Sequence, residues 1–310
     1  DTKRGDNMNK DSYYLKFINQ ALEVASAIPK YFSKFSKKIF NNYQKITLLV
    51  LRQKLKTTYR DLVELLKITN IPSLIKLKRI PHFTTLIRFS KRLSPLLVRK
   101  LITYSCKISK PKKLKLGIDA TGLTLLEPST YYTIRTGKST IRRKFMQITA
   151  CVLLDKQLVS SCRIKRLTSI RNIDFLTTVR DSARLGRVEF VSADKGYDAE
   201  KHYEYVMNNL GSVLYIPIKK QRKGYKRRGF WRKKAAKLFN EDLYHQRSKI
   251  ETIFSVIKRK YGSVLGAKSC LTQGRELHQK VLTYNLDRLC KIIDHIILGC
   301  HQSLLPELLS

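Results

Sequence analysis

The sequence has few acidic residues, no long apolar run and no signal peptide, and these absences exclude several classes of protein. Of its 310 residues, 23 are Asp or Glu and 63 are Lys or Arg, so the formal net charge is +40. No apolar run reaches the roughly 18 residues of a membrane-spanning helix, and no signal peptide opens the chain. The sequence therefore predicts neither a membrane-spanning nor a secreted protein.

Cysteine is present, but it lacks the spacing of a metal site. The chain has six Cys and no C-x-x-C pair. A zinc site could be drawn from Cys290, His295, Cys300 and His301, but the intervals between them match no common zinc pattern. We therefore expect reduced intracellular thiols that serve as small hydrophobic residues.

An excess of positive charge is what the composition does show. Hydrophobic residues make up 43% of the chain, which is enough for a globular fold. A compact chain of this charge repels itself unless a polyanion neutralises it. Nucleic acid is therefore the expected partner, with a membrane surface as the second expectation. A cytoplasmic, nucleoid-associated location follows from the first.

The segment from Tyr244 to Lys258 has the period of an amphipathic helix. No Pro or Gly interrupts it before Gly262, which is a helix stop signal. Its apolar residues recur at the spacing of one helix face: Ile250, Ile253, Phe254 and Ile257. We expect one uninterrupted helix over this segment.

A polar stripe lies beside the apolar one on this helix. At about 100° per residue, four side chains fall within a wedge of about 60°: Tyr244, Arg247, Glu251 and Lys258. A carboxylate among cations can hold a metal ion while its neighbours bind phosphates. The simpler interpretation is a solvated helix face with an i,i+4 ion pair between Arg247 and Glu251.

Two acidic residues further upstream belong to predicted strands, and we expect each at a strand end. Asp119 is the one acid in the apolar stretch that opens residues 114–127, where an ionised carboxylate is costly unless something pairs with it. A metal ion would pair with it; the alternative is a buried Asp bonded to backbone amides of the next bend. Asp194 follows a short strand over 187–191, at the carboxyl end, where open α/β sheets place their sites.

The remaining elements alternate between strands and helices. Asp155-Lys156 is a hairpin signal between two apolar or alternating runs. A helix is predicted over 172–185, another over 199–208 with Asp198 as its N-cap, and a strand over 212–216. Three strands, a helix, a strand, a helix, a strand and a long helix give a mixed α/β order.

The polar stripe has the spacing of a known signature. Tyr-x2-Arg-x3-Glu-x6-Lys, from Tyr244 to Lys258, resembles the Y-R-E-K signature of bacterial and archaeal insertion-sequence transposases. The stretches Asp-Ala-Thr-Gly at Asp119 and Ala-Asp-Lys-Gly-Tyr-Asp at Asp194 resemble the corresponding segments of that family, over residues ~45–290 in all. The resemblance implies a ribonuclease-H-like fold, with a mixed sheet flanked by helices and an all-α domain before it.

The resemblance also implies a DDE transposase and its chemistry. Asp119, Asp194 and Glu251 would be catalytic and would hold two Mg²⁺ ions, with Mn²⁺ as a substitute. Tyr244, Arg247 and Lys258 would hold phosphates of double-stranded DNA, first the transposon ends and then the target. Family members act as dimers or larger assemblies, so a homodimer is expected in the DNA complex.

Three alternatives stay open at the level of sequence. One is a nuclease of the same fold that hydrolyses DNA without joining strands. A second is a non-catalytic DNA-binding regulator or a decayed transposase, against which the three intact acids argue. A third is an RNA-binding protein, which is suggested by charge alone because no RNA-recognition motif is present.

The domain boundaries follow from composition and from the resemblance. We expect an N-terminal helical arm over 1–43, a helix-turn-helix-like DNA-binding domain over 44–106, a catalytic domain over 112–272, and a C-terminal helix over 273–310 that packs on the core. In the second unit, Thr58 is predicted to cap a helix and a basic helix follows, with Arg88, Lys91 and Arg92 as DNA contacts. A plain helical bundle is the alternative.

A strongly basic segment precedes the long helix. Eleven of the 19 residues from Lys219 to Lys237 are Lys or Arg, and they alternate with aromatic residues that include the single Trp. Basic residues release counterions from phosphates and aromatic rings stack on bases. We expect a loop that contacts DNA, unless it is only a solvated lysine-rich loop. The predicted contacts are Lys223, Lys226, Arg227, Arg228, Trp231 and Arg232.

Overall fold

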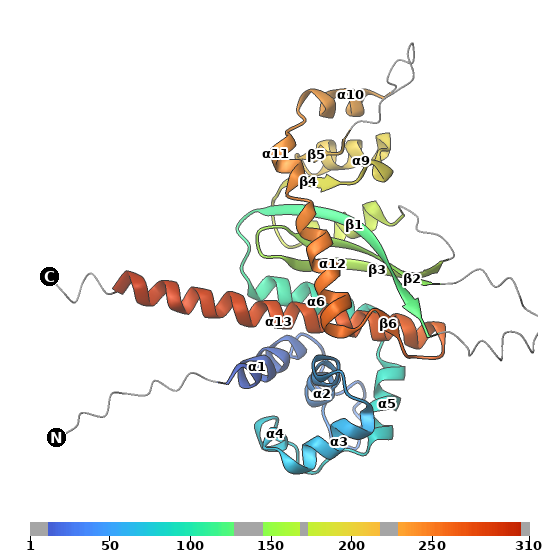
Figure 1. Cartoon of the computed structure of the whole chain (residues 1–310), viewed down its shortest axis with the longest axis vertical. Coiled ribbons are helices and arrows are strands. Elements are labelled where there is room, and N and C mark those ends of the chain that lie inside the picture. Colours follow the sequence, from blue (N-terminus) through green and yellow to red (C-terminus); the bar gives the residue numbers. More distant parts are fainter. Residues whose placement is uncertain (1–11, 127–144, 168–172, 218–228, 305–310) are drawn as a thin grey trace, which may run out of the picture.

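A mixed β-sheet forms the centre of the molecule (Figure 1). The computed structural model describes residues 12–126, 145–167, 173–217 and 229–304. Within them the strand order is β3-β2-β1-β4-β5, and β6 pairs with β1. The strands are β1 (Leu114–Leu125), β2 (Phe145–Leu153), β3 (Leu158–Leu167), β4 (Val188–Ala193), β5 (Val213–Tyr215) and β6 (Val264–Leu265).

The sheet has an antiparallel half and a parallel half. β1, β2 and β3 pair antiparallel, which confirms the hairpin around Asp155-Lys156, and β4 and β5 run parallel to β1. This order, flanked by helices and preceded by a helical region, confirms the predicted ribonuclease-H-like α/β fold.

The pairing of β1 with β4 ends directly before the acid that β1 carries. The parallel pairing of β1 with β4 ends at Ile118 opposite Ala193, while β1 continues against β2 as far as Thr124. Asp119 was expected at the end of a strand, but it lies inside the long strand β1. It does lie directly after the last residue that pairs with β4. Asp194 follows Ala193 directly, so Asp119 on β1 and Asp194 after β4 stand at the same level of the sheet.

Helices cover the sheet and connect its strands. They are α6 (Pro95–Ile108), α8 (Phe175–Ala183), α9 (Glu200–Glu204), α10 (Phe230–Lys237), α11 (Glu241–His245), α12 (Ser248–Tyr261) and α13 (Cys270–Leu304). A 3-10 turn over Lys195–Tyr197 and a π-helical turn over Tyr205–Asn209 complete the set. The predicted helix over 199–208 is thus split into α9 and the π turn.

Helix α12 packs directly on β1. Its predicted apolar face is buried, and Gly262, with φ +88°, ends it as predicted. A Cβ on Gly117 would lie 2.6 Å from Ile250 Cδ1 and 2.7 Å from Leu154 Cδ2. The glycine therefore lets α12 approach β1 closely enough to bring Glu251 beside Asp119.

The helix predicted from Tyr244 to Lys258 is broken. Tyr244 belongs to α11, a turn occupies Gln246 and Arg247, and α12 begins at Ser248. Around the turn the backbone bonds span three residues, as from Ile250 N to Arg247 O at 2.8 Å. A local 3-10 pattern therefore replaces the α-helical one.

A second unit of helices lies on the other side of α13, which runs between it and the sheet (Figure 1). It comprises α1 (Tyr13–Ala25), α2 (Asn42–Leu55), α3 (Tyr59–Ile68), α4 (Ile71–Leu74) and α5 (Phe83–Arg92). Thr58 caps α3 in a capping box with Asp61, as predicted. Residues 69–82, including α4, connect α3 to the basic helix α5. This connection is longer than the three- to four-residue turn typical of a helix-turn-helix.

Helix α1, in the segment expected to form an arm, is part of the core. Phe17, Ala21 and Val24 are buried in it. At its start, Tyr13 donates a hydrogen bond to Asp287 of α13, which also accepts from Lys54 of α2 and from Lys260 of α12. One buried carboxylate thus joins the helical unit to the helix that carries Glu251.

Two local predictions were wrong. The segment expected to be a basic loop folds as the helix α10 from Phe230 onward. Asp198 does not cap α9, because its carboxylate instead pairs with Arg232 of α10, 2.8 Å from Nε to Oδ1, and accepts from the Tyr203 hydroxyl. Asp198 therefore ties α10 to the sheet unit.

None of the helices in the described part of the chain combines the length and the apolar character that crossing a membrane requires.

Candidate active site

The three predicted acids come from three adjacent elements of the fold. Asp119 lies on β1, Asp194 follows β4, and Glu251 is in the first turn of α12. The side chain of Asp119 is 20% exposed and that of Glu251 is 62% exposed. One carboxylate is therefore recessed between the strands, and another faces it from the more open helix.

Arg247 connects two of these acids. Its Nη1 donates to Asp119 Oδ2 at 2.9 Å, and its Nη2 donates to Glu251 Oε1 at 2.8 Å. The ion pair of Arg247 with Glu251 is the one that the simpler interpretation of the helix predicts. The bond to Asp119 goes beyond it, because one guanidinium brings together carboxylates that are 132 positions apart (251 − 119).

The surroundings of Asp119 disfavour its charge despite these partners. Burial is the main cause that raises the pKa of Asp119, and the nearby carboxylates of Asp194 and Glu251 raise it further. Its bond from the Ala120 amide, 2.8 Å long, and the Arg247 guanidinium lower the pKa by less. Burial and the two neighbouring acids therefore outweigh the Ala120 amide and Arg247, and the pKa of Asp119 stays above its usual value.

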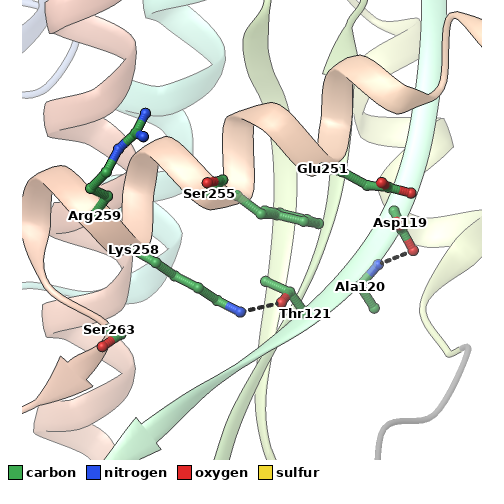
Figure 2. A pocket seen from close by; sticks show the side chains of 9 residues that line it. Asp119, Ala120, Thr121, Glu251, Ser255, Lys258, Arg259 and Ser263 are labelled. Atoms are coloured by element: carbon green, nitrogen blue, oxygen red, sulfur yellow. Dashed lines mark hydrogen bonds between the residues drawn. The ribbon is translucent and has the colours of Figure 1, made fainter.

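A cavity of about 580 Å³ opens beside Asp119 and Glu251. Figure 2 shows the Glu251 carboxylate extending from α12 toward Asp119 on β1, with Lys258 and Ser263 farther along. Asp194 is not among the described residues that line it. The cavity is open, and its two basic lining residues, Lys258 and Arg259, follow Glu251 along α12.

Lys258 occupies the middle of the cavity and reaches back to the strand. Its Nζ donates to Thr121 Oγ1 at 2.7 Å (Figure 2). Partial burial lowers the pKa of Lys258 from its usual value. Thr121 is two residues after Asp119 and shares its face of β1, so the strand presents a carboxylate and a hydroxyl to the same space.

Tyr244 lies beside Arg247 and not in the cavity. The Arg247 guanidinium carbon is 6.0 Å from the centre of the Tyr244 ring, and Phe239 packs on the same ring at 5.8 Å. The structure thus brings Tyr244, Arg247, Glu251 and Lys258 to one side of the α11–α12 segment, although the helix is broken between them.

The donor set fits a divalent cation in its chemistry. Three carboxylates from neighbouring elements supply the oxygen ligands that Mg²⁺ prefers. As the side chains stand, the described residues hold no group of three His, Cys, Asp or Glu close enough for a metal ion. The Arg247 guanidinium lies against both Asp119 and Glu251.

The predicted DNA contacts outside the cavity fall into two described groups. Arg88, Lys91 and Arg92 are exposed on α5. On α10, Trp231 is partly buried against the core beside Lys234, and Arg232 is paired with Asp198. Lys223, Lys226, Arg227 and Arg228 lie outside the described residues.

Sequence reasoning missed several residues of the cavity. Thr121, Ser255, Arg259 and Ser263 line it with the predicted residues. Ser255 and Arg259 follow Glu251 at intervals of four, so the helical period already placed them on its face. Alternation along β1 gave the same signal for Thr121, whereas nothing in the sequence placed Ser263.

Comparison with known proteins gives a family for this arrangement. The family model described as Transposase DDE domain matches residues 110–286, which is more than half of the chain. The matched region contains all three acids and the whole sheet. No match to the chain is found among curated proteins.

Proposed function

Because the chain belongs to the transposase DDE domain family, we propose that it cleaves DNA at the ends of an insertion sequence and joins those ends to target DNA. Members of this family typically are catalytic, bind DNA and use divalent metal ions. The observation that carries the proposal is the meeting of Asp119, Glu251 and Arg247 at the point where β1 leaves β4. Water would attack the scissile phosphodiester, and the 3′-hydroxyl released would attack the target.

Asp119, Asp194 and Glu251 would hold two Mg²⁺ ions, for which Mn²⁺ can substitute. Bound there, the ions would activate the attacking oxygen and stabilise the leaving one. Asp119 would be the central ligand, because its strand β1 pairs with β4, which precedes Asp194, and packs against α12, which carries Glu251. Support comes from the charge balance, in which one shared guanidinium leaves the pKa of Asp119 raised.

Arg247 has two roles in this proposal. In the free protein it pairs with Asp119 and Glu251 and holds their side chains in place. When the acids bind cations, Arg247 is released to contact a phosphate beside the scissile bond, together with Tyr244. Lys258 is directed into the cavity by Thr121 and would contact the phosphate on the other side.

The helical unit and α10 would hold the DNA farther from the reacting bond. Arg88, Lys91 and Arg92 of α5, with the basic segment that includes Trp231 and Arg232, would contact the duplex. Two ends would be held together by a homodimer, which analytical sedimentation of the DNA complex can detect. The chain would act in the cytoplasm, at the nucleoid.

The proposal is tested by Mg²⁺-dependent cleavage of plasmid DNA that carries the ends of the element. Asp119→Asn, Asp194→Asn and Glu251→Gln keep side-chain shape and remove charge. Glu241→Gln, at an exposed acid of α11 that pairs with His245, is the matched control. We expect the three site variants to bind DNA without cutting it and the control to cut normally.

Other outcomes would favour the alternatives. Equal cleavage by all variants would place the site elsewhere. Binding without cleavage by the wild type would favour a non-catalytic regulator or a decayed transposase. Cleavage without joining, in an assay with pre-cleaved ends and a target plasmid, would favour a nuclease that only hydrolyses DNA.

A further inference from the structure

A second cavity, of about 670 Å³, separates the helical unit from the catalytic unit. One wall is formed by the end of α2, the start of α3 and one side of α5. The other wall is residues 266–269 and the first turns of α13. Figure 1 places the start of α13 and β6 next to α5. We call this cavity the interdomain cleft.

The interdomain cleft is basic on both walls. Arg52, Lys56 and Lys91 line it from the helical unit, and Lys268 lines it from the catalytic unit. Among the described residues that line it, the one carboxylate is Glu276. That carboxylate accepts bonds from the amides of Gly266 and Ala267, at 3.3 and 2.9 Å. Glu276 therefore pairs with groups of its own wall and does not neutralise the basic side chains on the opposite wall.

Two residues of the helical wall also carry buried polar groups without a partner. Arg52 Nε and Thr57 Oγ1 make no hydrogen bond in the described structure. The Arg52 guanidinium carbon lies over the Tyr59 ring, 4.3 Å from its centre, and Nη1 donates one weak bond of 3.4 Å to the Thr57 carbonyl. Donors without acceptors are costly, and an anionic oxygen is the acceptor that suits a guanidinium and a hydroxyl together.

One hydrogen bond links the wall of the interdomain cleft to the wall of the catalytic cavity. Lys56 Nζ donates to the carbonyl of Arg259 at 3.2 Å, and Arg259 itself lines the catalytic cavity. Eight residues of helix separate Glu251 from Arg259 (259 − 251), which is about 12 Å at 1.5 Å per residue. A DNA strand advances about 3.4 Å per phosphate, so this distance corresponds to about three to four nucleotides.

We propose that the interdomain cleft holds the sugar-phosphate backbone of the DNA strand from about the fourth nucleotide beyond the scissile bond. This rests on the proposed function, in which the scissile bond lies at Asp119 and Glu251. Lys56 and Lys91 on one side and Lys268 on the other would contact the same stretch of phosphates. The helical unit and the catalytic unit would then grip one duplex, and binding in the cleft would set the distance of the cut from the bound sequence.

An exposed thiol that lies between two cleft-lining residues in the sequence serves as a probe of the cleft. Cys270 is exposed at the start of α13, between the lining residues Ser269 and Thr272. The described cysteines Cys106, Cys151, Cys162 and Cys290 are buried. Alkylation of Cys270, followed peptide by peptide by mass spectrometry, should slow at least five-fold when a terminal-sequence duplex is bound. An unchanged rate in a saturated complex would overturn the proposal.

The salt dependence of DNA binding measures the number of phosphate contacts that the cleft makes. Lys56→Asn suits the left-handed backbone at that residue, φ 54°, and is combined with Lys268→Gln. This double variant should reduce the slope of log K against log salt concentration by about 2, one for each lost phosphate contact. The matched control is Lys100→Gln with Lys201→Gln, at exposed lysines of α6 and α9, which should leave the slope unchanged.

The same experiments separate this proposal from the proposed function. If the wild type neither binds nor cuts terminal-sequence DNA, both fail. If it binds and cuts, but Cys270 is unprotected and the two double variants have equal slopes, only the cleft proposal fails. Thermal unfolding of each variant shows whether it is folded, and protection of Cys270 in the wild type does not depend on any substitution.

Discussion

Two recessed carboxylates of this molecule are paired with cations, and their pKa values are shifted in opposite directions. Burial alone would raise the pKa of Asp287, but hydrogen bonds from Lys54, Tyr13 and Lys260 outweigh burial and lower it to about 2. Burial raises the pKa of Asp119 as well, and there the single guanidinium of Arg247 does not compensate for it. Asp287 has its full set of partners, whereas Asp119 does not.

The difference separates a structural carboxylate from a functional one. Asp287 is 5% exposed and joins four helices, so its charge is permanently paired within the fold. Asp119 borders an open cavity and shares its one cation with Glu251. We propose that an acid with a raised pKa beside open space, as Asp119 is, receives an external cation. Four changes would test this comparison.

The largest effect is expected from Asp119→Asn. Loss of a charged ligand to the catalytic ions should reduce DNA cleavage by about 10³-fold or more, because such ions stabilise a transition state by several kcal/mol. Stability should not fall. The folded pKa of Asp119 is raised, so its ionised form opposes folding at neutral pH, and the amide removes that opposition. Chemical denaturation in EDTA measures this, and a destabilised variant would contradict it.

Asp287→Asn should show the reverse pattern. The pKa of about 2, against 3.8 for a free Asp, corresponds to about 2 kcal/mol of stability at pH 7. Because the folded pKa is lowered, this contribution is present above pH 3.8 and is lost as the pH falls toward about 2. The variant should therefore be less stable than the wild type at pH 7 and differ less from it in acid. Cleavage well below the unfolding temperature should change less than about threefold. A loss of cleavage as large as that of Asp119→Asn would break the distinction between the two acids.

Gly117→Ala tests how closely the two elements of the site must approach. The new Cβ would meet Ile250 and Leu154 at under 3 Å, and overpacking of this kind costs about 1–3 kcal/mol. Displacement of α12 from β1 should also separate Glu251 from Asp119 and reduce cleavage. Gly274→Ala in α13, where the new Cβ would meet Met146 and Ile164 at ordinary contact distances of 3.6 and 3.9 Å, is the control. Equal behaviour of the two variants would show that the close approach is unimportant.

The smallest effect is the change in Mn²⁺ affinity expected from Arg247→Gln. Its direction shows whether the arginine competes with the ions or supports them. Removal of the internal cation should make Mn²⁺ bind the free protein about three- to tenfold more tightly, as measured by electron paramagnetic resonance, although cleavage falls because a phosphate contact is lost. Arg232→Gln removes a guanidinium that pairs with Asp198 and should leave Mn²⁺ affinity unchanged. Weaker Mn²⁺ binding by Arg247→Gln would mean that the arginine supports the ions and does not compete with them.

Most of the catalytic fold could be predicted from local patterns. Alternation gave β2 and β3, and the helical period gave the buried face of α12. Asp119 and Asp194 stood out because an acid within or directly after an apolar strand requires a partner. The sequence therefore predicts Asp119 and Asp194 from these local signals, and Glu251 from its place in the polar stripe and the spacing of that stripe.

The contacts that distinguish the two carboxylates have no local signal. Asp287 lies between Leu286 and Leu289 and resembles any exposed acid on a helix, until α1, α2 and α12 pack around it. The bond of Arg247 to Asp119 spans 128 positions. The turn at Gln246 and Arg247 contains no helix-breaking residue, and the helical fold of α10 was hidden by its charge. Each depends on tertiary packing that a pattern in one segment does not contain.

The most direct test of the central claim is to locate the bound ion on the polypeptide. Fe²⁺ replaces Mg²⁺ in the DNA complex, and peroxide with ascorbate then cuts the backbone beside the ion. The account predicts cuts near residues 119, 194 and 251 that excess Mg²⁺ suppresses, that Asp119→Asn removes and that Asp287→Asn retains. Cuts elsewhere, or cuts at these residues that persist in Asp119→Asn, would contradict it.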